Sequence, residues 1–122
     1  MITGFVTPFR EAVVSVKIQG AQGTEQQIDA VIDTGYNGAL TLPLPMIRTL
    51  GLPWRRRGRA LLADGRDIIF DTYEATLLWD GQPCRVAVDA AAADPLVGMA
   101  LLQGFELTMQ VVDGGHVTIE SL

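Results

Sequence analysis

The sequence predicts an all-β fold, and two observations support this prediction. Apolar residues alternate with polar residues in several short segments, which is the pattern of half-buried strands. Glycine- and aspartate-containing turns separate these segments at close intervals, as in small β-barrels and β-sandwiches. The chain has 122 residues, of which 48% are hydrophobic, enough for one folded domain with its own core rather than a disordered chain. We therefore expect a single domain over residues 1–122.

The first part of the chain is expected to form a hairpin that ends at an aspartate. Residues 14–19 alternate between apolar and polar side chains, residues 20–23 predict a turn, and residues 28–32 alternate again. This second strand leads directly into Asp33. The hairpin therefore delivers Asp33 to the end of a strand, immediately before a glycine-containing turn.

The middle of the chain predicts a short strand, a short helix and a second hairpin. Residues 40–42 continue as a strand, and residues 46–50 followed by Gly51 have the pattern of a helix closed by a C-terminal glycine. Residues 61–69 predict a hairpin whose tip is the Asp-Gly pair at residues 64–65.

The remaining chain predicts further short elements joined by glycine-containing turns. They are a hairpin of residues 72–79 and 85–88, a loop at 90–94, a short buried strand at 96–97, a helical turn at 99–103, and a strand pair at 105–112 and 117–119.

Composition restricts the partners and the location of the protein. The net charge of −5 disfavours binding to nucleic acid, and the arginines within residues 55–59 are expected to lie in a solvated loop. Trp54 and Trp79 are expected in the core or at a subunit seam. No apolar run is long enough to span a membrane, the N-terminal residues lack the features of a secretion signal, and Cys84 is the only cysteine. We therefore expect a cytoplasmic protein with no nucleic-acid or membrane partner.

The residue inventory excludes most common catalytic chemistries. His116 is the only histidine, so one chain cannot form a histidine-rich metal site. Neither serine lies in a G-x-S-x-G motif, and no glycine-rich phosphate loop is present. Cys84 and His116 are a conceivable nucleophile–base pair, but a core cysteine and a turn histidine explain them better. We expect no metal and no cofactor, and carboxylate chemistry remains.

Asp33, Thr34 and Gly35 form the tripeptide that best fits such chemistry. Peptide hydrolysis by carboxylates requires two of them about 3 Å apart that share one proton. The Thr34 hydroxyl can lock the loop by hydrogen bonding, and Gly35 lets the backbone approach the carboxylate and donate its N–H group. A structural turn carboxylate is the alternative interpretation of Asp33, because a D-T-G tripeptide alone is nonspecific.

In these features the chain resembles the retropepsin-like, single-domain aspartic proteases, in particular their small bacterial members. Three segments carry the resemblance in the order found in that family. Residues 28–35 are an apolar strand followed by D-T-G, the hairpin around residues 64–65 stands where the family has its substrate-covering flap, and residues 96–98 with the turn at 99–102 resemble its apolar-apolar-Gly element and short helix. Together the matching segments and the strands between them cover nearly the whole chain.

The resemblance implies a closed retropepsin-like β-barrel with one or two short helices. It also implies that Asp33, Thr34 and Gly35 are catalytic, with Thr34 locking a dimer. Since the chain has one D-T-G and is too short for two lobes, the second carboxylate must come from an identical chain. The expected function is therefore that of a homodimeric aspartic endopeptidase, in which two Asp33 carboxylates activate a water against a peptide or protein substrate.

The resemblance further implies substrate contacts in three segments. They are Tyr36, Asn37 and Gly38; Ala63, Asp64 and Gly65; and Leu96, Val97 and Gly98. Tyr36 replaces the alanine of viral relatives and is expected either to narrow the subsites or to pack at the dimer seam. Asn37 replaces their acidic residue and can still donate and accept hydrogen bonds. For Gly65 an ordinary turn, and for Gly98 a tight-packing position, are the alternatives.

Two classes of function remain open at this point, besides a small β-scaffold in which the D-T-G is coincidental. The first is the aspartic endopeptidase, which the intact D-T-G favours. The second is a retropepsin-like module for dimerisation or peptide binding, with little or no activity. The strand predicted at residues 117–119 is a candidate to join a dimer sheet, as terminal strands do in viral relatives.

Overall fold

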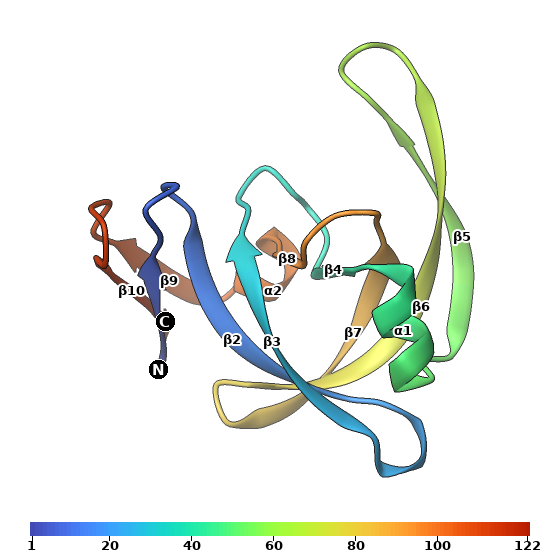
Figure 1. Ribbon diagram of the computed structural model, residues 1–122, viewed down its shortest axis with the longest axis horizontal. Helices are drawn as coiled ribbons and strands as arrows, with labels where there is room; N and C mark the ends of the chain where they lie inside the picture. The colour runs from blue at the N-terminus through green and yellow to red at the C-terminus, as the bar shows by residue number, and fades with distance from the viewer.

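The computed structural model describes residues 1–122 and consists mainly of β-strands (Figure 1). Strands contain 55% of the residues and helices 11%, which confirms the predicted all-β class. The strands are β1 (Ile2–Val6), β2 (Ala12–Gln19), β3 (Glu25–Ile32), β4 (Leu40–Leu42), β5 (Trp54–Leu61), β6 (Asp67–Trp79), β7 (Gln82–Ala90), β8 (Leu96–Val97), β9 (Phe105–Met109) and β10 (His116–Ser121). The helical elements are a 3₁₀ turn (Ala21–Gly23), α1 (Leu44–Leu50) and α2 (Met99–Leu102).

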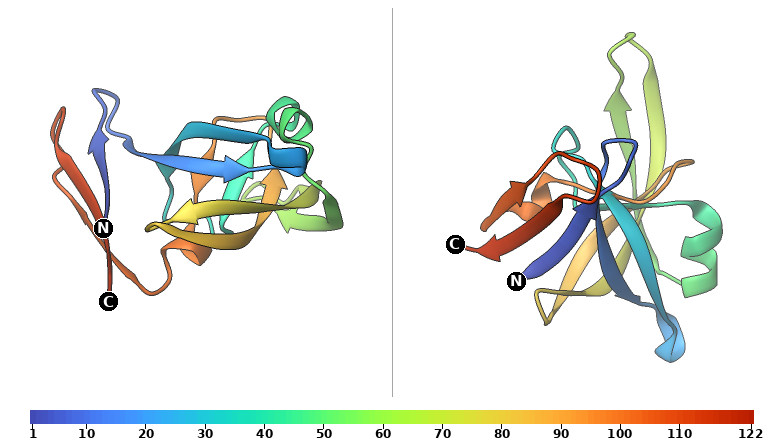
Figure 2. Two further views of the ribbon diagram at one scale, coloured as in Figure 1. Left: turned by 90° about the horizontal axis from the view of Figure 1, so that it is seen from below. Right: turned by 60° about the vertical axis from the view of Figure 1, so that its left-hand side comes forward.

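All ten strands belong to one sheet, in the order β5-β6-β7-β4-β8-β3-β2-β1-β10-β9. β6 also pairs with β2. In the series β6, β7, β4, β8, β3 and β2, each strand therefore pairs with the next, and the last strand pairs again with the first. Figure 2 shows these strands curling around a common interior, while β1, β9 and β10 stand to one side. Two pairs are parallel, β3 with β8 and β4 with β7. Both parallel pairs flank the segment that follows Asp33.

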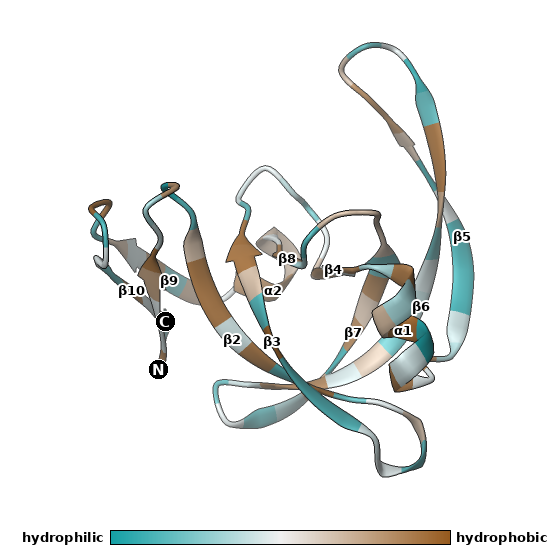
Figure 3. Ribbon diagram, viewed as in Figure 1, coloured by the Kyte–Doolittle hydropathy of each residue, from teal (hydrophilic) through white to brown (hydrophobic).

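The interior is a cluster of 22 buried apolar residues. Strand β2 shows how the sequence produces it, because Val14, Val16 and Ile18 are buried whereas Ser15 between them is exposed. The same alternation is visible as brown bands along β2 and β3 in Figure 3. A fully buried valine, leucine or isoleucine contributes about 1.5–3 kcal/mol, whereas an exposed ion pair contributes about 0–1 kcal/mol. The cluster therefore holds the sheet together.

Strands β5 and β6 form a long hairpin that projects from the rest of the molecule (Figure 1). Its register runs from Leu61 opposite Asp67 near the tip to Trp54 opposite Tyr73 at the base. The Asp-Gly tip was predicted correctly, but the hairpin is longer than residues 61–69. The reason is that the predicted strand at 72–79 continues the same strand, so that β6 has 13 residues.

The arginine cluster and one tryptophan differ from their predicted environments. Residues 55–59 lie on β5 rather than in a loop; β5 is an edge strand, and exposed charges protect such an edge from pairing with other chains. Trp54 is 58% exposed, so it does not lie in the core, and its alternative placement at a subunit seam stays a prediction. Trp79 is buried as predicted, and its ring meets that of Phe105 edge-on at 6.1 Å between centroids.

The two ends of the chain meet in the part of the sheet that lies to one side. β1, which the sequence pattern did not predict, pairs with both β2 and β10. β10 begins at His116, which was predicted to lie in a turn, and it has β1 on one edge and β9 on the other. The strand at residues 117–119 therefore has no free edge for a dimer sheet. The free edge belongs to β9, which ends at Met109 rather than at residue 112.

Helix α1 confirms the predicted short helix, although it begins two residues earlier, at Leu44. It ends at Leu50 and is followed by Gly51, whose φ of +63° is the left-handed conformation that closes helices and that glycine adopts without strain. Neither α1 nor α2 has the length and apolar character needed to cross a membrane.

Candidate functional site

Asp33 lies immediately after the end of β3, where β3 runs parallel to β8. Val31 is level with Leu96 and Ile32 with Val97, and the backbone N–H group of Asp33 donates to the carbonyl oxygen of Val97 at 2.9 Å. The D-T-G segment and the Leu-Val-Gly segment are far apart in the sequence, and this pairing makes them neighbours in space.

The backbone of its own loop orients the Asp33 carboxylate. Its Oδ1 accepts a hydrogen bond from the N–H group of Gly35 at 2.9 Å, which is the donor expected from the sequence. A Cβ atom built on Gly35 would lie 3.2 Å from that oxygen, so glycine permits the close approach. The N–H group of Tyr36 donates to the carbonyl oxygen of Asp33 at 3.2 Å and closes the turn. The carboxylate is partly exposed and forms no salt bridge.

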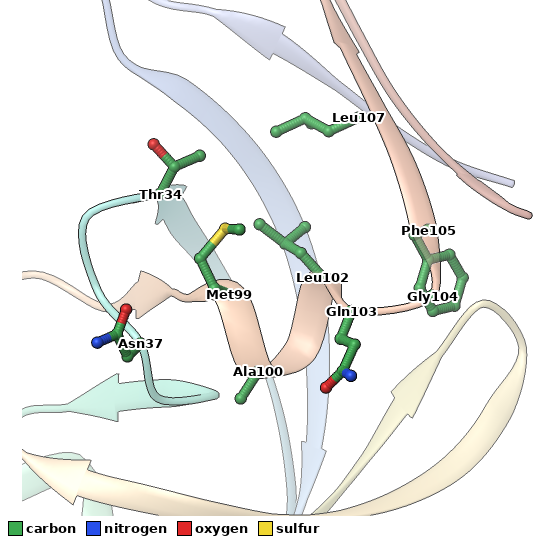
Figure 4. Close-up of a pocket in the computed structure, with 9 residues that line it drawn as sticks. All are labelled: Thr34, Asn37, Met99, Ala100, Leu102, Gln103, Gly104, Phe105 and Leu107. Atoms are coloured by element: carbon green, nitrogen blue, oxygen red, sulfur yellow. The ribbon is translucent and has the colours of Figure 1, made fainter.

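Thr34 is exposed, and its hydroxyl makes no hydrogen bond within the chain. The expected hydrogen bond that locks the loop is therefore absent within the chain, and the role of Thr34 in locking a dimer stays a prediction. Thr34 instead borders a cavity of about 540 Å³ between the D-T-G loop, α2 and the start of β9 (Figure 4). The other lining residues are Asn37, Met99, Ala100, Leu102, Gln103, Gly104, Phe105 and Leu107. Asn37 thus lies on the surface beside Thr34, and much of the cavity wall is apolar.

Gly98 is the point of closest contact between the two segments. A Cβ atom there would lie 2.2 Å from the carbonyl oxygen of Gly38 and 2.4 Å from Cδ2 of Tyr36. Gly98 and Val97 are both buried, so they contact the loop from the side of the core, whereas Leu96 is partly exposed. This placement favours the tight-packing interpretation of Gly98 over direct contact with a substrate.

Tyr36 is anchored inside its own chain. Its hydroxyl donates to Asp89 Oδ2 at 2.5 Å, and the hydroxyl of Thr72 donates to Asp89 Oδ1 at 2.8 Å. Burial, and then the hydrogen bond to Asp89 and its negative charge, raise the pKa of the Tyr36 phenol well above its usual range. The Tyr36 hydroxyl therefore stays protonated and acts as a donor to Asp89.

A second cavity, of about 240 Å³, lies between the D-T-G loop and the outer part of the β5–β6 hairpin. Tyr36 and Asp89 contribute polar groups, and the remaining lining residues are Thr41, Ala60, Ile68, Phe70, Ala90 and Ala91. Since Ile68 and Phe70 come from β6, the hairpin borders the same space as the loop. The cavity is mostly apolar, which suits an apolar side chain of a ligand.

The turn at the tip of the hairpin, in contrast, does not line this cavity. Ala63, Asp64 and Gly65 are all exposed and line none of the cavities. Gly65 has a φ of +86°, and Asp64 accepts a hydrogen bond from the side chain of Arg66 at 2.6 Å. The structure therefore brings the outer part of the hairpin, at Ala60, Ile68 and Phe70, next to the loop that carries Asp33, and not the predicted residues of the turn at its tip.

Two residues of the site, Asp89 and Thr72, were not found from the sequence. A signal for Asp89 was present, because it is the only charged residue in the otherwise apolar run 86–93. A carboxylate in such a run requires hydrogen-bond partners if it is buried. Thr72, which is fully buried, carried no comparable signal.

No cluster of three or more histidine, cysteine, aspartate or glutamate side chains is arranged to hold a metal ion. No protein-family model matches the chain, and a comparison with curated proteins gives no significant match. The candidate site therefore rests on the geometry around Asp33.

Proposed function

We propose that the protein is an aspartic endopeptidase of the retropepsin-like type that works as a homodimer. The observation that carries this proposal is the geometry of Asp33, which ends a strand, lies beside the Val97-Gly98 segment and has its carboxylate oriented by Gly35. A carboxylate that is both oriented and partly exposed suits the activation of a water molecule. One carboxylate cannot serve as base and acid in the same step, so a second one is required.

In this proposal the second carboxylate is Asp33 of an identical chain. A two-fold axis beside the D-T-G loop brings the same residue of both chains together. The surface around Thr34 supports this arrangement, because the Thr34 hydroxyl has no partner within the chain, and Met99 beside it is 46% exposed. Leu107 adds a further apolar group to this surface. A second chain would cover these groups and supply a partner for the hydroxyl.

A closed barrel of the retropepsin-like kind is part of the same proposal. The additional pairing of β6 with β2 and the parallel pairing of β3 with β8 support it. A cytoplasmic location is also proposed, since Cys84 is free and is the only cysteine.

The mechanism follows from a carboxylate pair that shares one proton. The ionised Asp33 takes a proton from the water, whose oxygen attacks the peptide carbonyl carbon, while the protonated Asp33 of the other chain donates its proton to the carbonyl oxygen. The cavity lined by Ile68 and Phe70 would receive an apolar side chain of the substrate.

Cleavage of a mixed peptide library tests this proposal, with Asp33→Asn compared against Asp29→Asn. Asp29 is exposed and lies on β3, four residues before Asp33, so the control removes the same charge outside the site. Loss of general acid–base catalysis should lower cleavage by about 10²- to 10⁴-fold in Asp33→Asn, and a pepstatin-type inhibitor should block the wild type. Asp29→Asn should retain full activity.

A mixing experiment tests whether both carboxylates are needed. When an equal amount of Asp33→Asn is added and the chains exchange freely, the number of wild-type pairs, and hence the activity, should fall to about half. Unchanged activity after exchange would contradict the shared site. If wild type and Asp33→Asn are equally inert but both dimerise and bind peptide, the protein is a binding module instead.

A further inference from the structure

We propose that Asp89 is a positioning residue. Through Tyr36 it holds the loop at residues 33–38 in the conformation that directs Asp33, and through Thr72 it ties this loop to the β5–β6 hairpin. The catalytic consequence of this inference rests on the proposed function, whereas its structural part does not.

Tyr36 is bonded to both segments that form the site. Its N–H group donates to the carbonyl oxygen of Asp33 at 3.2 Å, and its own carbonyl oxygen accepts the N–H group of Met99 at 2.8 Å. Any displacement of Tyr36 therefore shifts the turn after Asp33 and the start of α2 together.

The ring of Tyr36 fits a space that two glycines leave open. A Cβ atom on Gly38 would lie 2.2 Å from the Tyr36 hydroxyl oxygen, and one on Gly98 would lie 2.4 Å from Tyr36 Cδ2. The ring thus passes between the two segments, and its hydroxyl reaches Asp89 on β7. The conformation of the loop is in this way coupled to a residue 53 positions away in the sequence.

Asp89 is suited to fix this arrangement because both of its oxygens accept hydroxyl hydrogen bonds from different elements. β7 lies between β6 and β4, with Thr72 directly opposite Asp89 on one side and Thr41 on the other. No cation pairs with the Asp89 carboxylate. The donors to this carboxylate within the chain are therefore two hydroxyl groups, those of Tyr36 and Thr72.

Thr72, Asp89 and Thr41 form a row of polar side chains across three neighbouring strands, and Thr41 extends this row to β8. Thr41 Oγ1 accepts the N–H group of Leu96 at 3.0 Å, so Thr72, Asp89 and Thr41 together cross β6, β7 and β4 and reach β8. β8 in turn supports Asp33 through Val97. β6, one strand of the hairpin, is thereby connected to the loop of Asp33 by two routes. One runs through Asp89 and Tyr36, and the other runs through β7, β4 and β8.

The first readout does not depend on activity. Amide hydrogen exchange at residues 34–39 should become at least about tenfold faster in Tyr36→Phe and in Asp89→Asn, because the loop opens locally more often. Tyr73→Phe is the matched control: it removes the only other tyrosine hydroxyl of the chain, which makes no hydrogen bond in the structure. This variant should leave exchange in the loop unchanged.

The second readout is kinetic, and it separates positioning from a role in stability alone. For an equal amount of folded protein, Tyr36→Phe and Asp89→Asn should each lower kcat by about tenfold or more with little change in KM. The double variant should be no worse than either single variant, since both break the same contact. A role in stability alone would change the folded fraction and leave kcat of the folded protein unaltered.

The outcomes distinguish the inference from the proposed function. Unchanged loop exchange in both variants would overturn the inference. Faster exchange together with a wild type that cleaves no peptide would uphold the structural part and count against the proposed protease. Faster exchange with normal kcat in an active enzyme would overturn the positioning role in catalysis.

Discussion

Replacing Gly98 by alanine tests the contact on which the geometry of the site depends. The added Cβ atom would lie 2.2 Å from the carbonyl oxygen of Gly38, 2.4 Å from Tyr36 Cδ2 and 2.7 Å from the carbonyl oxygen of Tyr36. Two of these three atoms belong to the backbone, so no rotation of a side chain relieves the overlap. The loop at residues 36–38 must move away from α2.

The loss of folding stability in Gly98→Ala can be estimated from the displacement that the added methyl group forces on the loop. Overpacking a well-packed site by one methyl group typically costs about 1–3 kcal/mol. Because two of the three close contacts at Gly98 are with backbone atoms, we expect the upper end of this range, about 3 kcal/mol. In a domain of this size each kcal/mol corresponds to about 4 °C in Tm, so the expected decrease in Tm is about 12 °C.

Thermal unfolding followed by circular dichroism measures this effect, with Gly58→Ala as the control. The three atoms nearest to a Cβ atom on Gly58 are all ring atoms of Phe70, the nearest at 2.5 Å, and this ring lies in the projecting hairpin, where it can turn aside. The control should therefore lose less than about 1 kcal/mol. A Gly98→Ala protein that unfolds within about 2 °C of the wild type would refute the close contact between the two segments.

Three further predictions concern the loop, the surface beside it and pH. Gly35→Ala places a Cβ atom 3.2 Å from Asp33 Oδ1 and near nothing else, so kcat/KM for peptide cleavage should fall at least about tenfold while Tm changes little. Met99→Asp, at the cavity beside the D-T-G loop, should weaken self-association in sedimentation equilibrium by at least about tenfold, whereas Ile69→Asp on the exposed hairpin should not. Because the folded state raises the pKa of Tyr36, the unfolded chain loses this proton first. The stability that Tyr36 adds over Tyr36→Phe in urea unfolding should therefore be complete below about pH 10 and decline above it.

The parts of the fold that were predicted from the sequence are those that local patterns encode. The alternation along residues 14–19 and 28–32 gave the correct strands, and Gly51 marked the end of a helix at a position that requires a positive φ. β1 was not predicted, because its five residues are too few to define an alternation of polar and apolar side chains. Its pairing partners, β2 and β10, lie near opposite ends of the chain, so no local pattern indicates both of them.

The candidate site shows the same limit, because local patterns do not reveal contacts between residues that are distant in the sequence. Asp33 could be singled out as a candidate because D-T-G is contiguous, and the hydrogen bond from the Gly35 N–H group was expected because the two residues are close in the sequence. The contact between Tyr36 and Asp89 spans 53 positions, and it depends on β7 being placed between β6 and β4. Periodicity identifies strands but does not identify their neighbours, so the partner of Tyr36 could not be chosen from several acidic residues.

The position of the hairpin tip follows from the length of β6. A strand of 13 residues spans about 43 Å at a rise of about 3.3 Å per residue, so its tip lies far from the buried end that joins the core. Along β6 from the tip, Thr72 is the first buried residue, and everything before it is exposed or partly exposed. The hairpin thus leaves the body of the protein at Thr72, the residue that donates to Asp89. Asp89 thus accepts one hydrogen bond at the point where the hairpin leaves the body of the protein and another from Tyr36 in the loop after Asp33, and this is why we propose that one carboxylate links the two segments.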